Sequence, residues 1–129
     1  AMDFDSLMAA GSMAGSGGVI VMDETTSIVD VLDWAAKFFA DESCGQCSPC
    51  REGTGWVHRI LRRIVGGQGR IQDLDDLLGI AGNMEGNTIC VFADAAAWPV
   101  QSYITKFRDE FEEFIRTGQK VESREAANA

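Results

Sequence analysis

Residues 43–54 read SCGQCSPCREGT, and three cysteines, Cys44, Cys47 and Cys50, stand in them with two residues between neighbours. The only other cysteine of the chain is Cys90, far beyond this stretch. Structural zinc sites usually take their thiolates as separated pairs. A tight loop of three with a distant fourth is instead typical of a 4Fe-4S cluster, in which each thiolate binds a different iron. The spacing therefore favours a 4Fe-4S cluster, with Cys90 as the only cysteine left to be its fourth ligand.

Two other interpretations of these thiols stay open. They can bind zinc in a structural or interaction module, or stay unligated or become oxidised. His58, the only histidine, is an alternative ligand, although a position on a helix surface suits it better. Gly45 gives the backbone the freedom to wrap around a cluster, and Pro49 restricts the approach to the third cysteine.

Amphipathic helices are predicted on both sides of the cysteine stretch. The first follows an N-cap at Thr26 or Ser27 and runs to Glu42, and the second covers residues 54–67. Their expected core positions are Ile28, Val31, Leu32, Ala35, Phe38 and Phe39 in the first, and Trp56, Ile60 and Ile64 in the second.

Two more helices are predicted downstream. The third covers residues 71–86, and the fourth, the longest, has Pro99 in its first turn and continues to Ile115. Their expected core positions are Ile71, Leu74, Leu77, Leu78 and Ala81, then Val100, Tyr103, Ile104, Phe107, Phe111, Phe114 and Ile115. Four such helices with short connections predict a mainly α fold, a four-helix bundle. In a bundle the third connection can bring Cys90 over the cysteine loop, with Phe92 and Trp98 either shielding a cluster or packing in the core.

The N-terminal segment differs from the rest. A short helical turn leads to the glycine-rich residues 11–18, and VIVM at 19–22 predicts a strand, which needs a neighbour to be stable. The glycine-rich residues lack the lysine and the following helix of a phosphate loop, so a turn into the strand is favoured.

Composition excludes several classes of protein. The 129 residues carry a formal net charge of -9, which argues against nucleic-acid binding. The cluster Arg59, Arg62 and Arg63 is too small to reverse this and is interpreted as a solvated or partner-facing stripe. No stretch is apolar enough to span a membrane and no signal peptide is found, so we expect a cytoplasmic protein in which thiols serve metal or redox chemistry.

Four motifs in order, GSGGVIVMDE, ESCGQCSPCREGT, EGNTIC and DAAAWPVQSYITKFRDEFE, closely resemble the C-terminal part of the NADH- and FMN-binding F subunit of NADH-quinone oxidoreductase (respiratory complex I). The resemblance runs from about residue 3 to residue 114 and implies a helical domain with one 4Fe-4S cluster on Cys44, Cys47, Cys50 and Cys90. Diaphorase subunits of NAD-reducing hydrogenases and formate dehydrogenases look similar. Val91 and Phe92 depart from the family pattern by their size, which affects packing after the fourth ligand.

The resemblance also implies an organisation and a context. Residues 1–25 would be the end of a ubiquitin-like β-grasp (SLBB) domain, with Ala1 and Met2 as a cloning scar, 26–116 the cluster domain and 117–129 a flexible tail. The family's N-terminal domain binds NADH and FMN. From reduced FMN, electrons pass to the cluster and to neighbouring iron-sulfur subunits, toward quinone, in the peripheral arm of a membrane-bound complex. This chain lacks that domain, so we expect it not to oxidise NADH alone.

Overall fold

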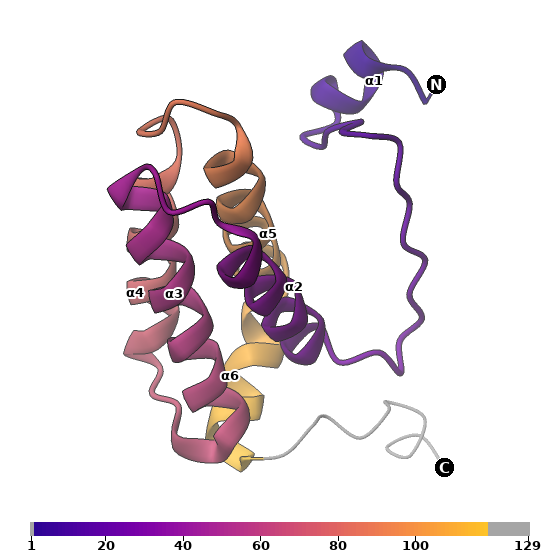
Figure 1. Ribbon diagram of the computed structural model, residues 1–129. Coiled ribbons are helices and arrows are strands. Elements are labelled where there is room, and N and C mark those ends of the chain that lie inside the picture. Colours follow the sequence, from indigo (N-terminus) through magenta and orange to yellow (C-terminus); the bar gives the residue numbers. More distant parts are fainter. Residues whose placement is uncertain (1, 119–129) are drawn as a thin grey trace.

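The computed structural model describes residues 2–118, and the chain is mainly helical there (Figure 1), as predicted. Ala1 and most of the predicted tail, residues 119–129, lie outside the described residues. The elements are α1 (Phe4–Ala9), α2 (Ile28–Glu42), α3 (Ser48–Arg63), the short π-helical turn η1 (Ile64–Gln68), α4 (Gln72–Met84), α5 (Phe92–Lys106) and α6 (Arg108–Thr117).

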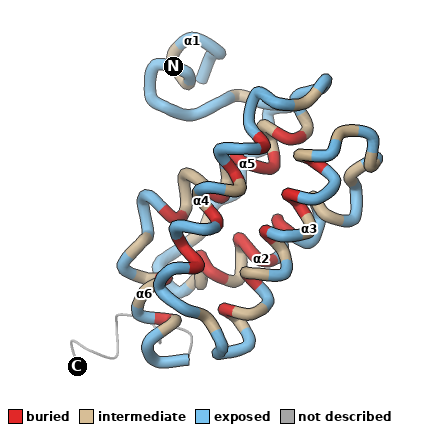
Figure 2. Tube along the Cα trace, turned by 90° about the vertical axis from the view of Figure 1, so that its left-hand side faces the viewer, coloured by how far each residue is buried: buried red, intermediate tan, exposed pale blue. Residues whose placement is uncertain are grey.

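The helices α2 to α5 pack around one core, and α6 closes one end of it. Helix α3 lies between α2 and α4, α5 contacts all three of them, and α6 packs on η1, α2 and α5. Figure 2 shows the buried residues on the inward sides of these helices, whereas α1 lies apart. The largest completely enclosed side chains are Leu32, Leu61, Ile64, Leu74, Leu77, Met84, Ile104 and Phe111.

Local signals explain how α2 and α3 begin. The Ser27 hydroxyl accepts a hydrogen bond from the Asp30 amide at 3.3 Å, so the predicted N-cap of α2 is confirmed. Helix α3 begins at Ser48, earlier than predicted, because Pro49 fits a first helical turn, where no intrahelical amide bond is needed. Cys50 therefore lies on a helix and not in a loop.

The predicted fourth helix is wrong in its bounds. Helix α5 starts at Phe92, Pro99 lies inside it, and the chain breaks at Phe107 before α6 starts. Proline usually disrupts a helix interior. Here Ala96 and Ala97, which precede it by three and two residues, are buried against the other helices, and this packing outweighs the local preference.

Some predicted core positions are also wrong. Phe38 and Trp56 expose about half of their surface, and Ile71 and Phe107 are exposed as well. The apolar stripe is wider than the surface that neighbouring helices cover, and Phe107 sits at the break between α5 and α6. The other predicted core positions are buried or partly buried.

The strand predicted at residues 19–22 does not form, and the part of the chain that the structure describes contains no strand at all. Val19, Ile20 and Val21 are largely exposed, because no second strand is present to pair with them. The short N-terminal helix is confirmed as α1, capped by the Asp3 carboxylate. The β-grasp remnant and the domain boundaries stay predictions.

Candidate metal centre

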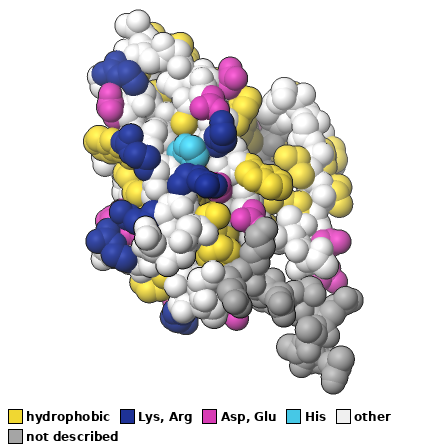
Figure 3. Space-filling model, turned by 60° about the horizontal axis from the view of Figure 1, so that its bottom comes forward, with side chains coloured by type: hydrophobic (Ala, Val, Ile, Leu, Met, Phe, Trp, Pro, Cys, Tyr) yellow, Lys and Arg dark blue, Asp and Glu magenta, His cyan; other side chains and the backbone are white. Residues whose placement is uncertain are grey.

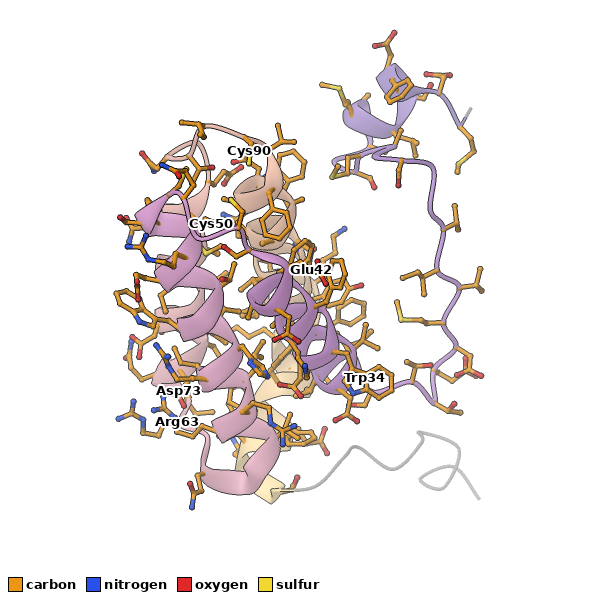
Figure 4. The ribbon with its side chains drawn as sticks, viewed as in Figure 1. Trp34, Glu42, Cys50, Arg63, Asp73 and Cys90 are labelled. Atoms are coloured by element: carbon orange, nitrogen blue, oxygen red, sulfur yellow. The ribbon has the colours of Figure 1, made fainter. Side chains whose placement is uncertain are left out.

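The four cysteines lie at one end of the helical domain. Successive helices run in opposite directions, so the α2–α3 and α4–α5 connections come to the same end, where Figure 4 labels Cys50 and Cys90. The fold thus brings two segments that are distant in the sequence to the same end, whereas the four-helix bundle itself stays a prediction.

The cysteines differ in their exposure. Cys50 is 7% exposed, in the first turn of α3, and Cys47 is half-buried at the N-cap of this helix. Cys44 and Cys90 are exposed, and all four thiols are free of disulfides. Among residues 2–118, no three or more Cys, His, Asp or Glu side chains stand close enough to hold a metal. The four thiols therefore do not form a closed set among these residues.

A hydrogen-bond network shapes the cysteine loop. The Ser43 hydroxyl lies 3.3 Å from the Cys50 sulfur and 3.4 Å from the Gly45 amide. The Arg51 guanidinium donates to the Gly45 carbonyl at 2.8 Å, and Gly45 has φ +75°, a conformation that side-chain-bearing residues rarely adopt. The sequence had suggested the role of Gly45, but nothing in the spacing pointed to Ser43 or Arg51.

The segment that carries Cys90 is tied to α5. Glu85 accepts hydrogen bonds from the Trp98 indole at 2.6 Å and from the Gln101 amide at 2.9 Å. These two donors, Gln101 first, hold the pKa of Glu85 below its usual value. The Asp94 carboxylate accepts from the Gly86 amide at 2.7 Å. The sequence does not indicate these contacts, because the residues become neighbours only when the connection folds back on α5.

Of the two aromatic residues near the site, Phe92 packs against the core, one of the two roles expected for it, whereas Trp98 takes neither expected role. Phe92 is partly buried against the core and contacts Phe39 edge-to-face, with ring centroids 5.5 Å apart. Trp98 lies at the surface, where its indole holds Glu85. Phe92 is thus a core aromatic near the cysteine end.

His58 is poorly placed to be a ligand. It lies about two helical turns, about 12 Å, beyond Cys50 along α3. Its Nε2 atom is buried and has no hydrogen-bond partner among the described residues. Figure 3 shows the imidazole with Lys and Arg side chains around it. These positive charges disfavour the binding of a metal cation beside His58.

Comparison with known proteins settles the family. The profile of the NADH-ubiquinone oxidoreductase-F iron-sulfur binding region matches residues 30–114, which include all four cysteines. The chain belongs to this family.

Curated relatives of the oxidoreductase-F region agree with this assignment. The chain is 52% identical to the F subunit of NADH-quinone oxidoreductase from Rickettsia felis over 115 residues, 89% of this chain and 27% of that protein. With the same subunit from Rickettsia bellii the identity is also 52%, over 89% of the chain and 28% of the relative. For Rickettsia conorii it is 50% over 120 residues, 93% of the chain and 28% of the relative. The chain thus spans just over a quarter of these relatives and matches their C-terminal portion.

The residues at the cysteine end suit the cluster after which the oxidoreductase-F region is named. Four thiolates are the usual donor set for a 4Fe-4S cluster. Cys47 and Cys50 lie at the N-terminal end of α3, toward which the positive end of its dipole points, and Gly45 adopts a left-handed turn between Cys44 and Cys47. The donor set and the loop conformation therefore fit the cluster.

The oxidoreductase-F region has no membrane-spanning element in the described part of this chain. None of the helices between residues 2 and 118 combines the length and the apolar character that crossing a bilayer requires.

Proposed function

We propose that this chain is an electron-transfer module of the type found in the F subunit of complex I and holds one 4Fe-4S cluster through Cys44, Cys47, Cys50 and Cys90. The observation that carries the proposal is the meeting of a three-cysteine turn and a single distant cysteine at one end of a domain of this family. When bound, the cluster supplies a centre that takes up and gives away one electron at a time.

The residues of this chain hold and shield that centre. Cys50 and Cys47 provide the inner thiolates at the start of α3, and Cys44 and Cys90 close the set from the exposed side. The Phe39–Phe92 pair keeps water from the core near the site. Since only electrons move, no side chain has to act as an acid, a base or a nucleophile.

The wider function rests on the longer relatives, which are named as F subunits of NADH-quinone oxidoreductase. A complete subunit of this type would bind NADH and FMN in its N-terminal portion. Electrons would pass from reduced FMN to the cluster and then to neighbouring iron-sulfur subunits of the peripheral arm, toward quinone. The present chain alone would not oxidise NADH.

Anaerobic reconstitution with iron and sulfide tests the proposal. We expect about four irons and four sulfides per chain, a broad brown absorbance and an EPR signal after reduction. A colourless protein that binds one zinc, or no metal at all, would contradict it and favour a structural or interaction module.

The ligand set is tested with Cys90→Ser. This variant should lose most of the cluster or show a changed EPR spectrum, whereas Thr88→Ser, in the same connection, should match the wild type because serine keeps the hydroxyl that donates to the Cys90 carbonyl at 2.9 Å. An unchanged spectrum in Cys90→Ser would show that the fourth ligand is not Cys90.

A further inference from the structure

The peptide groups of Gly45 are held from both sides. Its amide faces the Ser43 hydroxyl at 3.4 Å, and its carbonyl accepts a hydrogen bond of 2.8 Å from Nη1 of Arg51. Gly45 lies between Cys44 and Cys47, so fixing this residue fixes the path of the chain between two of the four thiols.

Arg51 is the side chain that reaches back across this loop. It follows Cys50 in α3, and its Nη2 also approaches the Ser48 hydroxyl at 3.4 Å. Its own amide donates to the Cys47 carbonyl at 2.9 Å. Arg51 thereby contacts the backbone on each side of Gln46, through its guanidinium at Gly45 and through its own amide at Cys47. The planar guanidinium, which reaches Gly45 and Ser48 with two nitrogens, is better suited to such a forked contact than an ammonium group.

The positive charge of Arg51 is held in position by these contacts and by one with a neighbouring carboxylate. Its Nε donates to Glu52 at 3.0 Å, so a carboxylate partly offsets the positive charge. The reduction potential of an iron-sulfur cluster depends on nearby charge, because a fixed cation favours the more negative, reduced state.

We infer that Arg51 is a positioning residue of the cluster site: its guanidinium holds the Gly45 carbonyl, fixes the path of the backbone between Cys44 and Cys47 and raises the cluster's potential. The inference rests on the proposed function. It adds a residue that holds no metal and acts through the loop.

Three measurements on the reconstituted chain and its Arg51→Met variant test this role. A chelator should withdraw iron from the variant about tenfold faster, the factor expected from losing one hydrogen bond to a charged donor. The midpoint potential in an EPR-monitored redox titration should be lower. Hydrogen exchange in the peptide covering residues 43–50 should be faster, and this measurement is made on the protein without iron.

Related variants separate the tether from the charge. Arg51→Lys should keep a potential near that of the wild type and release iron at an intermediate rate, because lysine keeps the charge and offers a single contact. Glu52→Gln should raise the potential without changing iron release. Arg59→Met is the matched control, since Arg59 is exposed on the same helix, about two helical turns beyond Arg51.

The possible outcomes are distinct. If Arg51→Met behaves like Arg59→Met in iron release and hydrogen exchange, the positioning role is overturned. A potential as low in Arg51→Lys as in Arg51→Met would overturn the role of the charge. If the wild type takes up no cluster, the proposed function fails, whereas the exchange measurement still decides whether Arg51 holds the loop.

Discussion

The Arg63 guanidinium donates two hydrogen bonds, 2.6 and 3.1 Å long, to the completely buried carboxylate of Asp73. The amide and the side chain of Arg70 donate to the same carboxylate. Burial raises the pKa of Asp73, but the hydrogen bonds from Arg70 and Arg63 outweigh it and hold this pKa below the usual value. The pair joins the end of α3 to the start of α4, at the end of the domain opposite the cysteines (Figure 4).

Asp73→Asn should lower the free energy of unfolding by about 2 kcal/mol at pH 7, because Arg63 and Arg70, whose side chains are solvent-accessible, lose the charged acceptor of their hydrogen bonds. The pKa of Asp73 is lower in the folded chain than its ordinary value of 3.8, so its stabilising effect is complete above that value. The effect is lost as the pH falls through the lower, folded-state pKa.

Urea unfolding of the wild type and Asp73→Asn over a pH series measures this difference. The difference should shrink below about pH 4. Asp76→Asn, on the exposed side of α4, should change the stability by less than about 0.5 kcal/mol. A penalty for Asp73→Asn that stayed constant down to pH 2 would show that the charge of Asp73 is not responsible.

Gly53→Ala should lower the free energy of unfolding by about 2 kcal/mol, since the new methyl group would lie 2.5 Å from Cγ and Sδ of Met84. Gly79→Ala is the control, because its methyl group would meet no atom within 4 Å and alanine favours a helix by up to about 1 kcal/mol. Thermal unfolding of both variants checks the opposite signs. Equal changes in stability for the two variants would mean that Met84 or the α3–α4 packing shifts at little cost to make room for the methyl group at Gly53.

Glu110→Ala should destabilise the domain by about 1 kcal/mol. Its carboxylate, on α6, accepts a hydrogen bond of 2.8 Å from the Ile28 amide and so caps the start of α2 from a distant part of the chain. Glu113→Ala removes an exposed carboxylate from the same helix and should have little effect. Denaturant unfolding compares the two variants, and an equal loss in both would assign the effect to the net charge and not to the cap.

Glu85→Ala should loosen the connection that carries Cys90, because Trp98 and Gln101 lose their shared acceptor. Hydrogen exchange in residues 85–91 should become faster, while exchange in residues 43–50 stays as in the wild type. The exposed Glu113→Ala variant again provides the control. Unchanged exchange in residues 85–91 would mean that the Gly86–Asp94 hydrogen bond suffices to hold the connection.

Periodicity predicted much of this fold. The mainly helical class, the N-cap at Ser27 and the buried stripe of Leu74, Leu77 and Ala81 depend on local sequence, and all three are confirmed. The break at Phe107 and the continuation of α5 through Pro99 depend on packing between helices, which periodicity does not contain.

The candidate site divides in the same way. The cysteine spacing predicts that the four thiols hold one 4Fe-4S cluster, and this stays a prediction, although the fold brings the two cysteine-bearing connections to the same end. Arg51, Ser43 and Glu85 were not predicted, because their partners are backbone groups or side chains that become neighbours only when the connections fold. The exposure of Cys44 and Cys90 was likewise beyond the sequence.

The ion pairs of Asp73 and the cysteines lie at opposite ends of this domain. The buried carboxylate of Asp73 and its arginine partners lie at one end and all four cysteines at the other, with the length of the helices between them (Figure 4). Substitutions at the arginine end can therefore change the stability of the fold without altering the residues around the cysteines. A designer seeking a more stable domain can start there, a helix length away from every cysteine.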